Sequence, residues 1–137
     1  MAENKNAGFL KIVLIIFAVV TLIYGIGYLI VPDCLVNMSG GQPVFHGWLR
    51  WSGGILIALG IGAILICLNP QNQGIFVTTI TLGSLLCGLG LLWAWINPEE
   101  EQNTWFVALS TIVALALAIM LYFSRFKAKE ILYPKKE

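Results

Sequence analysis

The residues most able to do chemistry lie near the start of the second apolar segment of the chain. His46 and Arg50 are four positions apart, so a helix places them on one face. A guanidinium within an apolar helix needs a partner, and Asp33 is the nearest candidate counter-ion, with Glu99 second. Two interpretations follow. Arg50 forms an ion pair that joins the first two helices, or it binds a phosphate, a carboxylate or a quinone carbonyl.

His46 and three cysteines are the remaining candidates for metal or redox chemistry. One imidazole without other ligands at metal-binding spacing makes a poor metal site. Cys34, Cys67 and Cys87 are widely separated, and no Cys-x-x-Cys motif occurs. Since no phosphate-binding loop or catalytic motif is present either, we expect no metal, no cofactor and no enzymatic activity. For Cys34, an intermolecular disulfide is the alternative to a free thiol.

Tryptophan is confined to the half of the expected helices that contains Arg50. Tyr28 and, one turn deeper, Tyr24 belong to the same half. Membrane proteins usually carry aromatic belts at both interfaces. A one-sided distribution therefore indicates an outward-facing pocket or a docking surface, unless it is an ordinary belt drawn from few residues. These tryptophans, here called the aromatic collar, are Trp48, Trp51, Trp93, Trp95 and Trp105.

Composition indicates the elements that must position these residues. The chain of 137 residues is 58% hydrophobic and only 11% charged, with a mean hydropathy of +0.85. About a quarter of the residues of a soluble domain are charged. The apolar residues form four blocks, each long enough to cross about 30 Å of hydrocarbon as a helix. The sequence predicts one all-α domain over 1–137, an up-down bundle of four transmembrane helices at 9–31, 44–68, 74–96 and 104–124.

The charges predict an orientation. Four spans place both termini on one side, and that side holds seven of the eight Lys and Arg residues, including the basic tail at 125–137. By the positive-inside rule this side is cytoplasmic. The net charge of +1 gives no reason to expect a nucleic-acid partner.

Small residues at four-residue spacing predict close helix packing. In the second helix these are Gly53 and the stripe Gly54, Ala58 and Gly62. Similar stripes follow in the third and fourth helices, at Thr79, Gly83 and Cys87 and at Ser110, Ala114 and Ala118. The same pattern fits a homo-oligomer interface.

The chain also resembles small bacterial four-helix membrane proteins that are DoxX-like in architecture. The resemblance covers residues 9–125 and rests on a glycine at 25 or 27, on Pro32 and on the segment LRWSGGILIALGIG at 49–62. Within that segment, Arg50 followed by Gly53 and Gly54 matches an Arg-x-x-Gly-Gly element. The resemblance implies the fold, a bacterial inner-membrane location and importance of Arg50 and the glycine pair. DoxX is associated with thiosulfate:quinone oxidoreduction, but no redox centre occurs here, so the reaction is not carried over.

Two functional classes remain. The first is a non-enzymatic accessory or scaffold subunit that contacts other membrane subunits, or further copies of itself, through its aromatic half and small-residue faces. The second is a binder of a lipid- or quinone-like amphipathic molecule whose head group is held by Arg50 and flanked by the aromatic collar. A cavity beside Arg50 would favour the second class. A filled bundle with Arg50 paired to Asp33 would favour the first.

Overall fold

The computed structural model describes residues 2–41 and 47–134, with side chains from residue 7 onward. Its described part is all α-helical. Four long helices follow one another along the chain, and two short helices accompany them. The long helices are α1 (Ala2–Ile30), α3 (Gly47–Leu68), α4 (Gly74–Ile96) and α5 (Thr104–Lys127), and the short ones are α2 (Pro32–Ser39) and α6 (Lys129–Leu132).

The four long helices confirm the predicted all-α architecture with four candidate membrane spans. Their apolar parts run for 22 to 24 residues. At a rise of 1.5 Å per residue, such a length crosses the roughly 30 Å hydrocarbon core of a bilayer. Asn69-Pro70 and Asn97-Pro98 follow α3 and α4, since proline cannot continue a helix. The chain is a small integral membrane protein.

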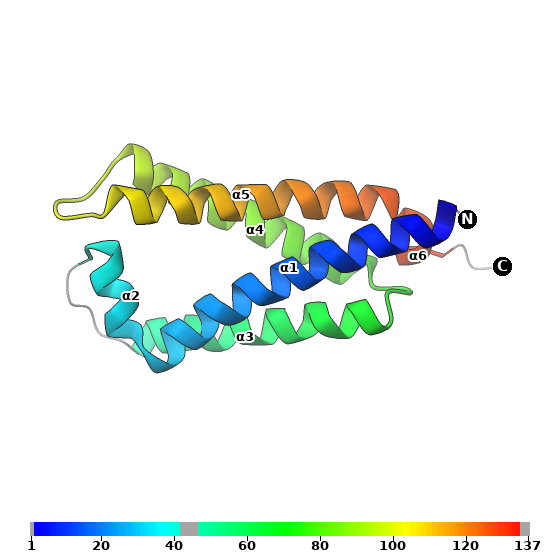
Figure 1. Cartoon of the computed structure of the whole chain (residues 1–137), viewed down its shortest axis with the longest axis horizontal. Coiled ribbons are helices and arrows are strands. Elements are labelled where there is room, and N and C mark those ends of the chain that lie inside the picture. The colour runs from blue at the N-terminus through cyan, green and yellow to red at the C-terminus, as the bar shows by residue number, and fades with distance from the viewer. Residues whose placement is uncertain (1, 42–46, 135–137) are drawn as a thin grey trace.

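The long helices pack as two antiparallel pairs (Figure 1). One pair is α1 with α3, the other is α4 with α5, and the pairs meet chiefly through α1 and α5. Both termini lie at one end of the bundle, here called the terminal end. The other end carries α2 and the segment joining α4 to α5, and is called the α2 end. In Figure 1 the ribbons of the two pairs separate toward the α2 end.

The buried core occupies the terminal half of the bundle. Leu10, Leu14 and Leu121 are completely buried, and they belong to one continuous apolar cluster contributed by all four long helices. The cluster extends to Leu132 of α6, which is 1% exposed. Part of the expected basic tail is therefore folded against the bundle.

Tyr133 attaches the end of α6 to the start of α4. Its hydroxyl is 2.9 Å from the Oγ1 of Thr78, within hydrogen-bonding distance. The guanidinium of Arg125 lies 5.9 Å from the centre of the Tyr133 ring. The hydrogen bond with Thr78, assisted by Arg125, lowers the pKa of the Tyr133 hydroxyl from its ordinary value. The contact holds the chain after α5 at the terminal end.

Gly53 brings α3 directly onto α1. A Cβ atom at position 53 would lie 2.7 Å from the carbonyl oxygen of Gly25 and 2.9 Å from the amide nitrogen of Leu29. Both are backbone atoms, so no side-chain rotation relieves the clash. Gly60 and Ala63 are buried on the same helix. Gly53 is thus a position of close backbone approach between α1 and α3.

The stripe of Gly54, Ala58 and Gly62 differs from the prediction. Gly54 and Ala58 are exposed, and a Cβ atom at Gly54 would meet nothing within 4 Å. Gly62 does pack, against the ring of Phe76. The reason is rotational: consecutive residues of a helix point about 100° apart, so the face that meets α1 passes through Gly53 and leaves Gly54 outside. Within the described chain, Gly54 and Ala58 are not packing positions.

Helix α2 occupies part of the region from 33 to 42 that the sequence predicts to be a loop. Pro32 ends α1 but also begins α2, because its fixed φ suits the first turn of a helix. Asp33 lies in that first turn, where a carboxylate is favourable. Gly40 ends α2 with φ of 70°, a conformation that favours glycine.

Candidate functional site

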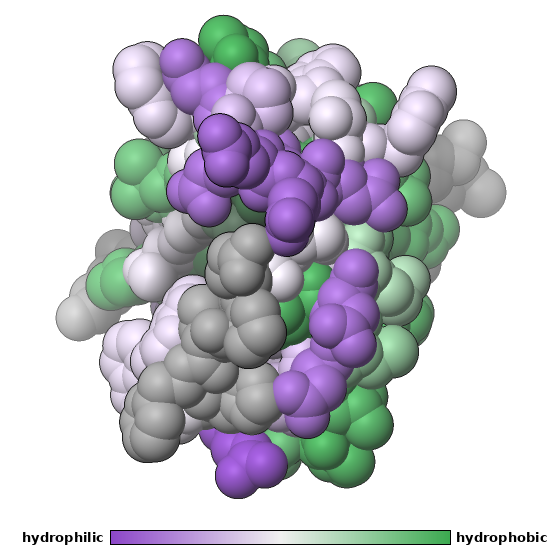
Figure 2. Space-filling view, turned by 90° about the vertical axis from the view of Figure 1, so that its left-hand side faces the viewer, coloured by the Kyte–Doolittle hydropathy of each residue, from purple (hydrophilic) through white to green (hydrophobic). Residues whose placement is uncertain are grey.

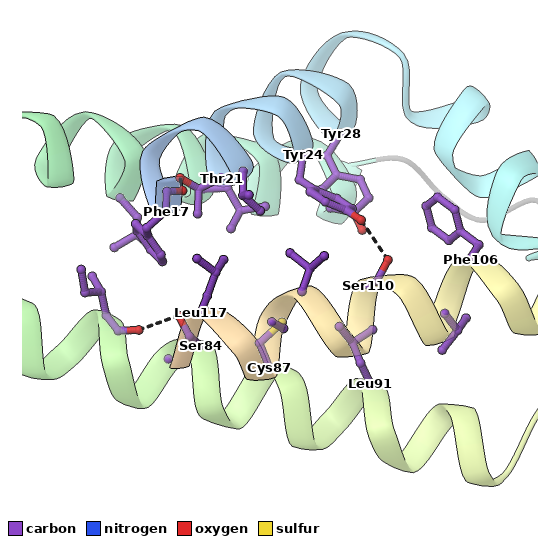
Figure 3. A pocket seen from close by; sticks show the side chains of 18 of the residues that line it. Phe17, Thr21, Tyr24, Tyr28, Ser84, Cys87, Leu91, Phe106, Ser110 and Leu117 are labelled. Carbon is purple, nitrogen blue, oxygen red and sulfur yellow. Dashed lines mark hydrogen bonds between the residues drawn. The ribbon is translucent and has the colours of Figure 1, made fainter. Parts of the chain in front are cut away.

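A cavity of about 440 Å³ lies between the two helix pairs, in the half of the bundle toward the α2 end (Figure 3). Its volume falls in the usual range of small-molecule sites. Most of the lining is apolar, and every long helix contributes to it. The lining residues are Phe17, Val20, Thr21, Tyr24 and Tyr28 of α1, Ser39 of α2, Leu56 and Leu59 of α3, Thr79, Ile80, Gly83, Ser84, Cys87 and Leu91 of α4, and Phe106, Val107, Ser110, Val113, Ala114 and Leu117 of α5.

Three hydroxyl groups gather on opposite walls of this cavity. The hydroxyl of Tyr24 lies 2.9 Å from the Oγ of Ser110, so a hydrogen bond joins α1 to α5 across the space (Figure 3). Tyr28 is one turn further along α1, and its ring centre is 6.2 Å from that of Tyr24. No described residue forms a hydrogen bond with the Tyr28 hydroxyl. Tyr24, Tyr28 and Ser110 are here called the hydroxyl cluster.

The other hydroxyl groups of the lining donate to the backbone of their own helices. The Oγ1 of Thr21 donates to the carbonyl of Phe17 at 2.9 Å, and the Oγ of Ser84 donates to the carbonyl of Ile80 at 2.8 Å. Ser39 and Thr79 do the same within α2 and α4. Among the described hydroxyl groups of the lining, those of the hydroxyl cluster are therefore the ones able to donate a hydrogen bond to a molecule in the cavity.

Two of the predicted packing stripes line this cavity. Thr79, Gly83 and Cys87 are exposed on α4, and a Cβ atom at Gly83 would meet nothing within 4 Å. On α5, Ser110 and Ala114 also line the cavity, whereas Ala118, one turn further, is buried. The small side chains leave the space open. Their exposed surface on α4 forms part of the cavity wall.

Asn103 joins α2 to the start of α5 beside the cavity. Its backbone nitrogen donates to the carbonyl of Ser39 at 2.8 Å, and its side-chain Nδ2 donates to the carbonyl of Met38 at 3.0 Å. Its Oδ1 accepts from the amide nitrogen of Phe106 at 3.3 Å and so caps α5. Since Ser39 and Phe106 both line the cavity, α2 lies across its end.

The surface at the α2 end is mostly polar. Figure 2 looks onto this end and shows hydrophilic residues around a recess in which hydrophobic atoms are visible. The long sides of the bundle carry exposed Ile, Leu and Val instead, as expected for surfaces in contact with lipid.

The structure does not bring Arg50 into this cavity. Arg50 is exposed on the first turn of α3, and it is not among the described residues of the lining. Asp33 is exposed on the first turn of α2. His46 lies outside the described residues. The predicted polar site around Arg50, His46 and Asp33 thus stays a prediction, separate from the cavity.

The aromatic collar lies on the outer surface of the bundle. Trp105 is the most exposed of these side chains, at 86%, and Trp95 the least, at 38%. None belongs to the lining that the described residues form. The aromatic residues that face the cavity are Phe17, Tyr24, Tyr28 and Phe106. The sequence contained a signal for two of them, since Tyr24 and Tyr28 are four residues apart and share a helix face.

Cysteines and metal-binding side chains are dispersed. Cys34 is exposed, Cys87 faces the cavity, and the Sγ of Cys67 lies 3.5 Å from the carbonyl oxygen of Lys11. Throughout 2–41 and 47–134, no three His, Cys, Asp or Glu side chains come together in a group suited to a metal ion.

Comparison with known proteins adds no assignment. The sequence matches no protein family, and no curated protein or solved structure is significantly similar to it.

Proposed function

We propose that this chain binds one small amphipathic molecule, taken from the bilayer, in the cavity between its two helix pairs. The observation that carries the proposal is a space of about 440 Å³ with a mainly apolar wall and a hydroxyl cluster toward one end. Binding sites for small molecules combine such an apolar enclosure with a few placed polar groups. Of the two functional classes expected from the sequence, this geometry favours the binder over the scaffold.

The packing of the bundle supports an occupant. Atoms that line an empty space lose the dispersion contacts that a filled space provides. The core of the terminal half is continuous, so these helices are able to pack closely where large side chains meet. An apolar body between the pairs restores the missing contacts.

An accessory or scaffold role is the second candidate, and one observation favours it. Gly54 and Ala58 form a small-residue edge on α3 that no described residue covers. Small residues allow the backbone of another helix to approach closely. This edge is suited to a helix of another membrane subunit or of a second copy of the chain.

A DoxX-like relationship and a bacterial inner-membrane location belong to the same proposal. The described basic residues Lys11, Arg125, Lys127 and Lys129 lie at the terminal end, which supports cytoplasmic termini. The resemblance carries no reaction with it. The proposed activity is binding.

Native mass spectrometry of the protein in lipid nanodiscs tests the two roles. The decisive variant is Gly83→Leu, which places a side chain in the cavity, and its matched control is Gly90→Leu. Both glycines lie on α4 with open space around them, but only Gly83 lines the cavity. We expect a retained small-molecule adduct on the wild type and on Gly90→Leu, and its loss from Gly83→Leu.

An equal adduct on all three proteins, or none on the wild type, would overturn the binding proposal. Retained protein subunits that are lost from Gly54→Leu would instead support the scaffold role.

A further inference from the structure

The head-group chemistry of the occupant follows from the polar groups inside the cavity, and it rests on the binding function proposed above. We propose that the cavity selects an uncharged amphiphile whose head carries a hydroxyl or carbonyl group, such as a long-chain alcohol, an acylglycerol or a quinone. The hydroxyl cluster recognises this head.

The part of the cavity wall formed by described residues offers no charged side chain to a ligand head. Among the described residues of the lining there is no Asp, Glu, Lys, Arg or His. Moving an ion from water into such surroundings is strongly unfavourable unless a counter-charge accompanies it. Arg50, the basic residue of α3, is exposed and outside this lining. The cavity therefore discriminates against carboxylate, phosphate and ammonium heads.

The hydroxyl cluster has hydrogen-bonding capacity left over. Tyr24 and Ser110 carry two hydroxyl protons and share one hydrogen bond, in which either can be the donor. The second proton and the free lone pairs are available to a third group. Tyr28 adds a hydroxyl that bonds to no described residue. The cluster can thus donate to a carbonyl and can both donate to and accept from an alcohol.

The cluster also orients the occupant. Tyr28 and Ser110 lie toward the α2 end, whereas Phe17 and Leu117 line the cavity nearer the middle of the bundle (Figure 3). The head lies toward the α2 end, and the apolar body extends between the helix pairs toward the core.

Cys87 provides a reporter inside the cavity. Its side chain projects from α4 toward the space between the pairs (Figure 3). Replacing Cys34 and Cys67 by Ser leaves Cys87 as the single thiol. Its rate of modification by N-ethylmaleimide, followed by intact-protein mass in phosphatidylcholine nanodiscs, then measures whether the cavity is filled. A variant that keeps only Cys34, which is exposed outside the cavity, controls for general effects of a probe on thiol reactivity.

Two probes with the same chain test the head-group selectivity. Hexadecanol is neutral, and hexadecyl sulfate keeps its charge at every working pH. We expect hexadecanol to slow the modification of Cys87 about tenfold and hexadecyl sulfate at the same mole fraction to leave it unchanged. A difference of that size in affinity corresponds to about 1.4 kcal/mol.

The outcomes separate this inference from the function on which it rests. If neither probe protects Cys87, the binding function itself fails. Equal protection by both probes, or protection by the sulfate alone, overturns the neutral-head inference and leaves a binding cavity.

Tyr28→Phe tests the role of the hydroxyl cluster. This change removes one hydroxyl and keeps the ring. We expect about fivefold more hexadecanol to be needed for half-protection, the effect of losing one net hydrogen bond. Tyr122→Phe, an exposed tyrosine on α5 outside the cavity lining, is the matched control. Unchanged protection in Tyr28→Phe would remove this residue from the head-group site.

Discussion

The two halves of the bundle are built from the same four helices but are packed in opposite ways. In the terminal half, Leu10, Leu14 and Leu121 meet in a core without solvent exposure. In the half toward the α2 end, small residues such as Gly83 and Ala114 face a cavity of about 440 Å³. The comparison teaches that side-chain volume along each helix, rather than overall hydrophobicity, decides where the bundle closes.

The largest loss of stability should come from truncating a buried side chain in the terminal half. Leu121→Ala removes a completely buried side chain, and we expect it to lower the free energy of unfolding by about 3 kcal/mol. Leu91→Ala, at the half-buried edge of the cavity, should cost less than about 1 kcal/mol because space is already present. Denaturant unfolding in detergent micelles measures both. Equal losses would contradict the contrast between the halves.

A smaller loss of stability should come from placing a side chain in the contact between α1 and α3. Gly53→Leu forces a side chain against the backbone of Gly25 and Leu29, and we expect a loss of about 2 kcal/mol in stability. Gly54→Leu should change stability by less than about 0.5 kcal/mol, as surface substitutions usually do. The thermal midpoint of the two variants in the same detergent is the measurement. A larger loss in Gly54→Leu would place that residue in an interface outside the described chain.

Enlarging a side chain should lower stability at a buried position and raise it at a position that faces the cavity. Ala118 and Ala114 are one turn apart on α5, the first buried and the second on the cavity wall. We expect Ala118→Leu to destabilise the protein by about 1.5 kcal/mol through overpacking. Ala114→Leu fills open space and should raise the thermal midpoint. If both variants lose stability equally, the cavity is not open at Ala114.

The smallest effect should come from releasing α2. Asn103→Ala removes the cap of α5 and the side-chain bond to Met38, and we expect a loss of about 1 kcal/mol. N-ethylmaleimide should also modify Cys87 faster, because α2 no longer lies firmly across the cavity. Asn97→Ala, whose Nδ2 donates to the Trp93 carbonyl on its own helix, is the control. Cys87 modification that is equally fast in both variants would argue against a closing role for α2.

The fold was largely predictable from the sequence, because apolar length alone identifies a membrane-spanning helix. The residue blocks that predict α3 and α4 end where Asn-Pro pairs follow, and the structure agrees. Helix α2 was not expected, since the predicted helices end at 31 and begin again at 44. Pro32 suits the first turn of a helix, which allows a new start between them.

The cavity could not be predicted, because a stripe of small residues has two physical outcomes. At Gly53 the neighbouring helix approaches and the glycine becomes a contact. At Gly83 no neighbour approaches, and an equivalent glycine becomes part of a wall. The difference depends on which residues of the neighbouring helices stand opposite each glycine, and the sequence of one helix does not show this. For the same reason the sequence indicated Arg50 as a candidate but did not predict the contact between Tyr24 and Ser110, which are 86 residues apart.

The hydrogen bond between Tyr24 and Ser110 has a mechanical consequence. At 2.9 Å it joins the two helix pairs toward the α2 end, and the apolar core joins them at the terminal end, so it limits how far the pairs can separate. A guest that uses only the remaining proton and lone pairs leaves this bond intact. The tie between α1 and α5 therefore survives binding, and the occupant meets a frame of fixed width at its head.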